Sequence, residues 1–252
     1  MIIKIIMEIW TASHISTVDR LNTLKHSINS GELVSSNQAL IIKHRVSISY
    51  SKDMEDLVLE FISASDCIVY DRGVSKMSQF QHLQYILSQV KQEDANTMIC
   101  FLDDDDLLLS FPQDSDSYDV IVGWQMIPID HAPPLMRKLA EHNGAECPRE
   151  LMLNLQSDLP VPGIKFMQEN KLILTYNAED FSGYSARLGI IREVLENVAK
   201  KSRFGLLINM VDLDIMNALD QYENRLNDRE HPFIYHRLMK SKDWIDLSLT
   251  FE

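Results

Sequence analysis

Four consecutive aspartates, Asp103–Asp106, directly follow the apolar segment Met98–Leu102. Carboxylates this close repel one another and raise each other's pKa values unless a cation lies between them. Their hard oxygen atoms suit Mg²⁺ or Mn²⁺, which proteins bind through one or two carboxylates together with substrate phosphates. An acidic run can also be a solvated turn, but the apolar segment before it favours a metal site at the end of a buried strand.

Strand and helix patterns alternate through the first half of the chain, and a less regular second half follows. We expect strands over Ile5–Ala12, Val46–Tyr50, Asp66–Tyr70, Thr97–Leu102, Val120–Trp124 and Leu172–Tyr176. We expect helices over Thr17–Ser30, from Ser51 with Met54, Leu57, Val58 and Phe61 on one face, over Gln79–Val90 and Ser182–Val198, and from Val211 or Asp212. Residues Pro133–Asn143 are predicted to be a short helix or a loop. Strand–helix units in series indicate an α/β protein with a mostly parallel sheet and flanking helices.

Ligands bind at the carboxyl ends of the strands in such sheets. Four segments are predicted to meet at that edge: Ala12–Ser16, Ser51, Asp71–Gly73 and Asp103–Asp106. The sequence therefore predicts one binding site there, with the aspartates as its acidic part. No repeat, low-complexity stretch or long linker divides residues 1–252, so we expect a single domain.

The charge of the chain limits its ligands. It has 37 acidic and 24 basic residues and a formal net charge of −13, which argues against a nucleic-acid binder because a phosphate backbone favours a basic face. A nucleotide remains compatible, since a divalent cation can supply positive charge. The three cysteines have no paired spacing, and the apolar segment at the start is too short to cross a bilayer. We therefore expect a cytoplasmic protein without a membrane span.

The run Phe101–Leu107, of sequence FLDDDDL, resembles the DXD motif of GT-A glycosyltransferases of the large family-two type, in their viral and bacterial members. Further segments resemble parts of these enzymes in the same order, over about residues 5–237: Thr11–Leu21, Ser78–His82, Phe181–Arg187, Val211–Ile215 and Phe233–Arg237. The resemblance implies a GT-A fold, which is Rossmann-like, in a single domain. Residues 1–110 would form its nucleotide-sugar half and residues 111–252 its acceptor half.

The resemblance also implies which residues hold the metal and the donor. The cation, Mn²⁺ or Mg²⁺, would bind Asp105, with Asp103 toward the ribose or the water shell of the metal. His236 would complete the shell, although it could instead be a core histidine. Asp104 with Asp106 is the alternative metal pair. The nucleotide, which we expect to be that of a UDP-sugar, would be contacted by Ala12, Ser13, His14, Arg20, Asp71, Gln79, His82, Asp103 and Asp104.

Sugar transfer also needs a base for the acceptor hydroxyl. Residues 211–215 resemble the EDxD motif of the family, with Val211 in place of its glutamate. Asp212 is therefore the predicted catalytic base, although an acid in a first helical turn is also favoured by the helix dipole alone. The chain lacks a QxxRW-like segment, which argues against a processive synthase. We expect transfer of one hexose, deoxyhexose or related sugar to a glycan or other hydroxyl acceptor, with inversion.

Structural roles compete with functional ones at three further positions. Asp71 could start a turn instead of contacting the nucleotide. Arg187 could pair with Glu179 or Asp180 instead of holding a diphosphate, and the ion pair is the preferred interpretation. Trp124 could be buried or could stack on an acceptor sugar.

Two other functions remain open. A nucleotidyltransferase also binds a nucleotide and Mg²⁺ at such an edge, but it usually has a glycine-rich segment after the first strand, and residues 11–20 contain no glycine. A non-catalytic nucleotide-sugar or glycan-binding protein is kept open by Val211 in place of the glutamate. A Mg²⁺ phosphohydrolase is disfavoured, because no DxDx[TV]-type nucleophile is placed for it.

Overall fold

The computed structural model describes residues 6–38, 40–91, 95–108, 110–112, 114–128, 172–176, 182–202 and 211–235. The helices are α1 (Val18–Gln38), α2 (Glu55–Ala64), α3 (Gln79–Gln89), α7 (Leu188–Ser202) and α8 (Val211–Leu219), with short 3-10 turns η1 (Lys52–Met54) and η3 (Ser115–Ser117). The strands are β1 (Ile6–Ile15), β2 (Ile41–Tyr50), β3 (Ile68–Val74), β4 (Met98–Phe101), β5 (Leu107–Leu108), β6 (Val120–Pro128), β7 (Leu172–Tyr176), β8 (Tyr184–Arg187) and β9 (Arg225–Tyr235). The strands form a nine-stranded sheet in the order β3-β2-β1-β4-β8-β6-β9-β5, with β7 beside β6.

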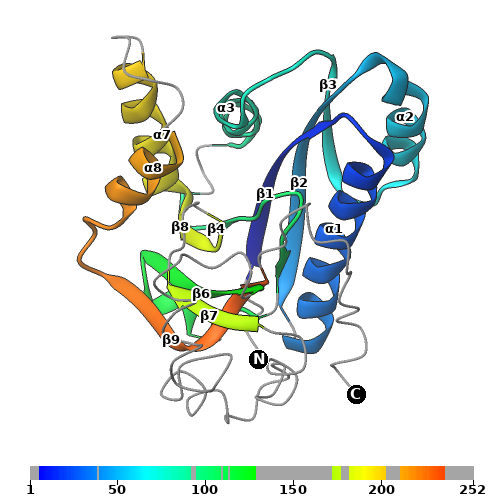
Figure 1. Ribbon diagram of the computed structural model, residues 1–252. Helices are drawn as coiled ribbons and strands as arrows, with labels where there is room; N and C mark the ends of the chain where they lie inside the picture. Colours follow the sequence, from blue (N-terminus) through cyan, green and yellow to red (C-terminus); the bar gives the residue numbers. More distant parts are fainter. Residues whose placement is uncertain are drawn as a thin grey trace.

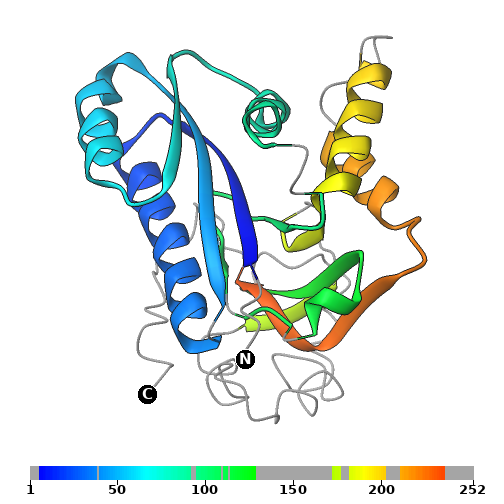
Figure 2. The same ribbon diagram turned by 180° about the vertical axis from the view of Figure 1, so that it is seen from behind.

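The half of the sheet built from β1 to β4 is parallel. β1 pairs with β2 and β4, and β2 pairs with β3. The order β3-β2-β1-β4 is that of the first half of a doubly wound Rossmann sheet. Helices α1 and α2 lie on one side of these strands and α3 lies on the other (Figure 1 and Figure 2). The predicted α/β fold with flanking helices is thus confirmed, and the parallel half contains residues expected at the site.

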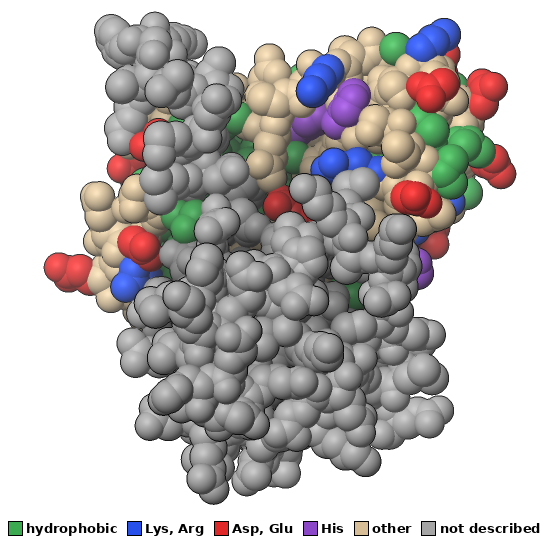
Figure 3. Space-filling view, viewed as in Figure 1, with side chains coloured by type: hydrophobic (Ala, Val, Ile, Leu, Met, Phe, Trp, Pro, Cys, Tyr) green, Lys and Arg blue, Asp and Glu red, His purple; other side chains and the backbone are tan. Residues whose placement is uncertain are grey.

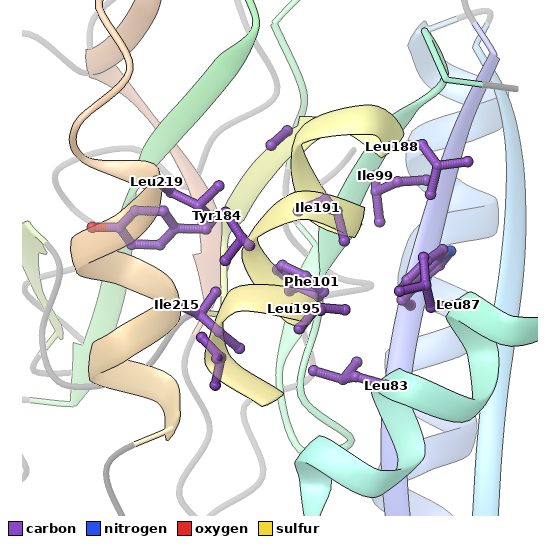
Figure 4. Close-up of a cluster of buried hydrophobic side chains, with 14 of the residues drawn as sticks. Leu83, Leu87, Ile99, Phe101, Tyr184, Leu188, Ile191, Leu195, Ile215 and Leu219 are labelled. Atoms are coloured by element: carbon purple, nitrogen blue, oxygen red, sulfur yellow. The ribbon is translucent and has the colours of Figure 1, made fainter. Parts of the chain in front are cut away.

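Alternation along the buried strands supplies a core on both faces of the sheet. In β1, Ile9 packs in one cluster with Val34 of α1, while its neighbour Trp10 packs in another with Phe80 and Leu83 of α3. The second cluster joins α3, α7, α8 and β4 (Figure 4), through Leu83, Leu87, Ile99, Phe101, Tyr184, Leu188, Ile191, Leu195, Ile215 and Leu219. Burial of each large apolar side chain contributes roughly 1.5–3 kcal/mol. This core therefore fixes α3 and β4, and the acidic segment comes shortly after the end of β4.

The other strands extend the sheet beyond β4 and bring in the second half of the chain. β8 runs antiparallel to both β4 and β6, and β7 runs antiparallel to β6. β9 is parallel to β6 and antiparallel to the short strand β5, which directly follows the four aspartates. The acidic segment is therefore held between two strands of the same sheet. Within the described residues, no helix is both long and apolar enough to cross a membrane.

The prediction of one helix over Ser182–Val198 is wrong in its first part. Residues Tyr184–Arg187 form β8, and α7 begins only at Leu188. Tyr184, Ser185 and Ala186 are buried between β4 and β6. Pairing on both edges favours the extended form here, and Gly183 precedes the strand with a φ of 88°. The predicted segment Pro133–Asn143 lies outside the described residues.

Several predicted boundaries also shift. α1 continues to Gln38 rather than ending near Ser30, and Thr17 caps it through a hydrogen bond from the Arg20 amide to its hydroxyl, 3.2 Å long. Ser51 does not cap a helix through its side chain; η1 follows it, and α2 starts at Glu55. Leu57 is 42% exposed, so it does not share the buried face of its neighbours.

Candidate functional site

A cavity of about 250 Å³ lies between the ends of β1 and β4. Strand order reverses between these two neighbours, and this switch point is where open α/β sheets bind ligands. The cavity is lined by Ala12, Ser13, His14, Arg20, Met77, Gln79, His82, Asp103, Asp104 and Asp105. Eight of the nine residues predicted to contact the nucleotide are in this set, as is the predicted metal ligand Asp105. The face of the molecule seen in Figure 3 includes histidine, basic and acidic side chains lying near one another.

Asp104 is a buried residue of the cavity wall that binds other side chains of the protein. Its carboxylate accepts hydrogen bonds from Arg20 Nε at 2.9 Å and from Arg20 Nη2 at 2.8 Å, in a two-pronged ion pair, and a further one from the Ser13 hydroxyl. Only 2% of Asp104 is exposed. Burial lowers the pKa of Arg20, but the hydrogen bonds and charge of Asp104, then the charges of Asp105 and Asp103, outweigh it and raise that pKa above its usual value. Asp104 is therefore engaged by a protein cation.

Asp103 and Asp105 line the cavity and are both partly exposed. Asp103 Oδ1 accepts a hydrogen bond of 2.6 Å from Gln79 Nε2, at the first residue of α3. The backbone amide of Asp103 donates to the Ser182 hydroxyl at 3.2 Å. Asp106, by contrast, is fully buried and is not among the lining residues. The geometry thus favours the pair Asp103 and Asp105 over the alternative pair Asp104 and Asp106.

Carboxylate oxygens of this kind suit a hard divalent cation. In the part of the chain that is described, however, no three His, Cys, Asp or Glu side chains are grouped so that they could hold a metal ion. The predicted third ligand, His236, lies outside the described residues. A cation on Asp103 and Asp105 would therefore need ligand or water oxygens for the rest of its shell, which is the usual mode for Mg²⁺.

Two histidines and two serines form a hydrogen-bonded chain beside the cavity. Ser49 Oγ lies 2.9 Å from His14 Nδ1 and 3.1 Å from His82 Nε2, and Ser47 Oγ lies 2.8 Å from His82 Nδ1. Burial, then the charge of Arg72 and the neighbouring His14, lower the pKa of His82 to about 4. Burial, followed by the positive charges of Arg20 and Lys76, lowers the pKa of His14. Both rings are therefore neutral at pH 7.

The sequence predicts only part of this hydrogen-bonded network. It predicts that His14 and His82 contact the nucleotide, yet both nitrogens of His82 bond to serines of β2. Ser47 and Ser49 are not among the predicted site residues. The signal for them is the alternation in Val46-Ser47-Ile48-Ser49-Tyr50, which places two small hydroxyls on one face of a buried strand.

Asp71 lies outside the cavity, in an irregular part of β3. It lies within β3 rather than after it, its Oδ1 accepts a 2.7 Å hydrogen bond from the Gly73 amide, and its Oδ2 accepts a 3.4 Å one from the Tyr50 hydroxyl. Gly73 has a φ of 72°, which suits a glycine in a turn. The turn interpretation therefore fits Asp71 better than the nucleotide contact.

Arg187 also has a structural role, with partners that differ from the predicted ones. It donates to the carbonyl oxygens of Asn96 at 2.8 Å and Asp116 at 2.7 Å, and it lies 3.6 Å from the Asp116 carboxylate. The expected partners Glu179 and Asp180 lie outside the described residues.

The structure describes the backbone of the predicted base. Asp212 is the second residue of α8, which begins at Val211 as expected. Trp124 lies in β6 opposite Tyr176 of β7. The side chains of Asp212 and Trp124 are outside what the structure describes, so their roles stay predictions.

No protein-family model and no curated protein matches the chain. Among solved structures, S. aureus TarS is similar with a TM-score of 0.48 and 11% identity, over 92% of this chain and 36% of that chain. This chain thus spans well under two thirds of the TarS chain. Mouse xyloside xylosyltransferase 1 is similar with a TM-score of 0.40 and 9% identity, over 92% and 97% of the two chains. The cytidylyltransferase IspD of Francisella tularensis has a TM-score of 0.42 and 9% identity, over 90% and 93%.

Proposed function

We propose that the chain is a glycosyltransferase that binds a nucleotide-diphosphate-sugar with Mn²⁺ or Mg²⁺ and moves one sugar to an acceptor hydroxyl. The observation that carries this proposal is the cavity at the switch point between β1 and β4, where Asp103, Asp105 and Arg20 line one space. Carboxylates for a cation and a guanidinium for phosphate oxygens are the groups that a metal–diphosphate complex requires.

Asp105 and Asp103 would hold the cation, while Gln79 fixes Asp103 and Arg20 fixes Asp104. When bound, the cation would neutralise the negative charge that develops on the diphosphate leaving group. The neutral His14 and His82 add polar groups to the cavity without adding charge, and His82 holds α3 against β2. An acceptor would approach from the half formed by residues 111–252, with Asp212 as its base and inversion at the sugar as the outcome.

The donor is proposed to be a UDP-sugar, and the reaction is proposed to take place in the cytoplasm. The compartment is supported by the cysteines, because Cys67 and Cys100 are both free thiols. A nucleotidyltransferase would use the same cavity but would release pyrophosphate instead of a nucleoside diphosphate. Product analysis therefore separates the two enzyme classes.

The test is calorimetric titration of UDP with Mn²⁺ and with EDTA, followed by UDP-sugar turnover. Wild type should bind UDP only with the cation, and Asp105→Asn should lose this binding because it loses a charged ligand. Asp53→Asn is the matched control, because Asp53 is an exposed acid in η1, outside the cavity. Equal UDP affinity of wild type and Asp105→Asn in Mn²⁺, or equal UDP affinity of wild type in Mn²⁺ and in EDTA, would overturn the metal assignment.

A further inference from the structure

We infer that Arg20 acts as a resident cation that prevents tight binding of a divalent cation by the cavity alone, so that the ion binds well only together with a nucleoside diphosphate. This inference rests on the proposed function and extends it. It assigns Arg20 and Asp104 as positioning residues that set the charge of the cavity, rather than as ligands of the metal.

The first support is the geometry of the ion pair. Arg20 projects from the first turn of α1, and its two hydrogen bonds to Asp104 span a separation of 84 residues in the sequence. The Asp104 side chain is 2% exposed and the Arg20 side chain 33% exposed. The anion is therefore buried, while part of the guanidinium remains accessible beside the cavity.

The second support is the charge of the cavity. Three aspartates and one arginine line it, which gives a formal charge of −2. The charges of Asp103 and Asp105, as well as that of Asp104, raise the pKa of Arg20. By reciprocity, the Arg20 charge is felt at Asp103 and Asp105, where it weakens the attraction of these carboxylates for a second cation.

The third support is the shortage of protein ligands. No group of three metal-ligating side chains occurs among the described residues, so an ion on Asp103 and Asp105 lacks a full shell. A diphosphate supplies oxygen atoms for that shell and negative charge for Arg20. A guanidinium has five N–H donors, and the two hydrogen bonds to Asp104 use Nε and Nη2. Arg20 thus has the capacity to bind a phosphate oxygen while it holds Asp104.

The experiment measures Mn²⁺ binding to the whole chain without nucleotide, from the electron paramagnetic resonance signal of free Mn²⁺. Arg20→Gln changes the formal cavity charge to −3 and should tighten Mn²⁺ binding by about tenfold, whereas Asp104→Asn changes it to −1 and should weaken binding by a similar factor. The double variant Arg20→Gln with Asp104→Asn restores −2 and should match wild type. Arg20→Lys should stay close to wild type because it keeps the charge.

Lys76→Gln is the control, since Lys76 is exposed and close enough to lower the pKa of His14, yet does not line the cavity. It should leave Mn²⁺ binding within about twofold of wild type, because an exposed charge is screened by salt. If Arg20→Gln does not fold, the other two variants still test the inference. Asp104→Asn should bind Mn²⁺ more weakly than wild type, and the double variant should bind it as wild type does. Should the double variant bind Mn²⁺ as weakly as Asp104→Asn, Asp104 is a metal ligand and the inference is overturned. If Mn²⁺ does not promote UDP binding to wild type at all, the proposed function falls together with the inference. If it does, and Arg20→Gln binds Mn²⁺ no more tightly, only the inference falls.

Discussion

Gln79 Nε2 donates a 2.6 Å hydrogen bond to Asp103 Oδ1, so the first residue of α3 orients one of the two carboxylates assigned to the cation. The start of α3 is itself fixed by a capping box. The Ser78 hydroxyl accepts from the Gln81 amide at 3.3 Å, and the Gln81 side chain accepts from the Ser78 amide at 2.8 Å. The carboxylate is therefore preorganised by the protein before any ligand binds.

Gln79→Leu should weaken Mn²⁺-dependent UDP binding by about tenfold, since a hydrogen bond to a charged group contributes about 1.5–3 kcal/mol. Thermal stability should change little, because Gln79 is partly exposed. Gln84→Leu is the matched control on the same helix, where Gln84 is exposed outside the cavity. Calorimetric titration checks the prediction, and equal affinities for the two variants would contradict it.

A buried ion pair joins β2 to β1 in the parallel half of the sheet. We expect it to affect only the stability of the protein. Arg45 Nε and Nη2 donate to the Glu8 carboxylate at 2.7 and 2.8 Å, and Trp10 Nε1 donates to it at 3.1 Å. Arg45→Met leaves Glu8 as an unpaired buried charge, so it should lower the free energy of unfolding by about 3–5 kcal/mol. Urea denaturation should show partial recovery in the double variant Arg45→Met with Glu8→Gln, and almost no effect in Lys43→Met, at an exposed site of the same strand. A double variant less stable than Arg45→Met would refute this account.

Buried His44 should make the protein sensitive to acid. The Thr11 hydroxyl donates to the Leu102 carbonyl at 2.9 Å, so at 2.8 Å its oxygen accepts the Nε2 proton of His44. Burial lowers the pKa of His44 to about 3. Between pH 6.5 and that value the unfolded chain takes up a proton that the folded chain does not, so stability is full above pH 6.5 and falls by about 1.4 kcal/mol per pH unit below it. His82, with a pKa of about 4, adds a second proton over part of this window.

Unfolding free energies from urea titrations at pH 5 to 8 check this prediction. His44→Gln keeps a donor for Thr11 but cannot be protonated. Its unfolding free energy should therefore fall less steeply toward pH 5 than that of wild type, by the slope that the uptake of about one proton gives. His26→Gln, at an exposed position of α1, is the control and should follow wild type. An unchanged pH slope for His44→Gln would mean that His44 is protonated in the folded protein.

The convergence of the site was predictable from the sequence because it depends on topology. Strand ends of a parallel sheet meet at one edge, so the sequence alone places Ser13 and Asp105 near each other. The different roles of the four aspartates were not predictable from the sequence. They depend on the reach of Arg20 from α1 to Asp104, which is a tertiary contact that a run of four identical residues cannot encode.

The same limit explains the error over β8. Residues Tyr184–Arg187 precede a strongly helical segment, and local pattern alone assigns them to that helix. Their extended form depends on pairing with β4 on one edge and β6 on the other. Such pairing joins segments far apart in the sequence, and strand preference follows this context more than composition. Asp71 was misplaced for a related reason, since β3 continues through Val74 along β2.

Asp212→Asn should lower sugar transfer by about a hundredfold or more, the usual contribution of general base catalysis, while UDP-sugar affinity changes little. Asp212 is the second residue of α8, and helical spacing places position 214 on another face of the helix. Inversion requires the base to act opposite the leaving diphosphate. α8 belongs to the half of the chain beyond the acidic segment, from which the acceptor is proposed to approach.

Asp214→Asn is the matched control two residues along the helix, and it should have a smaller effect on turnover. Single-turnover kinetics with saturating UDP-sugar measure the chemical step, and titration with UDP measures donor binding separately. If Asp214→Asn or Asp180→Asn is inactive and Asp212→Asn is active, the base lies at that other residue. If all three variants retain full turnover, transfer does not depend on a single carboxylate base, and the inverting mechanism has to be abandoned.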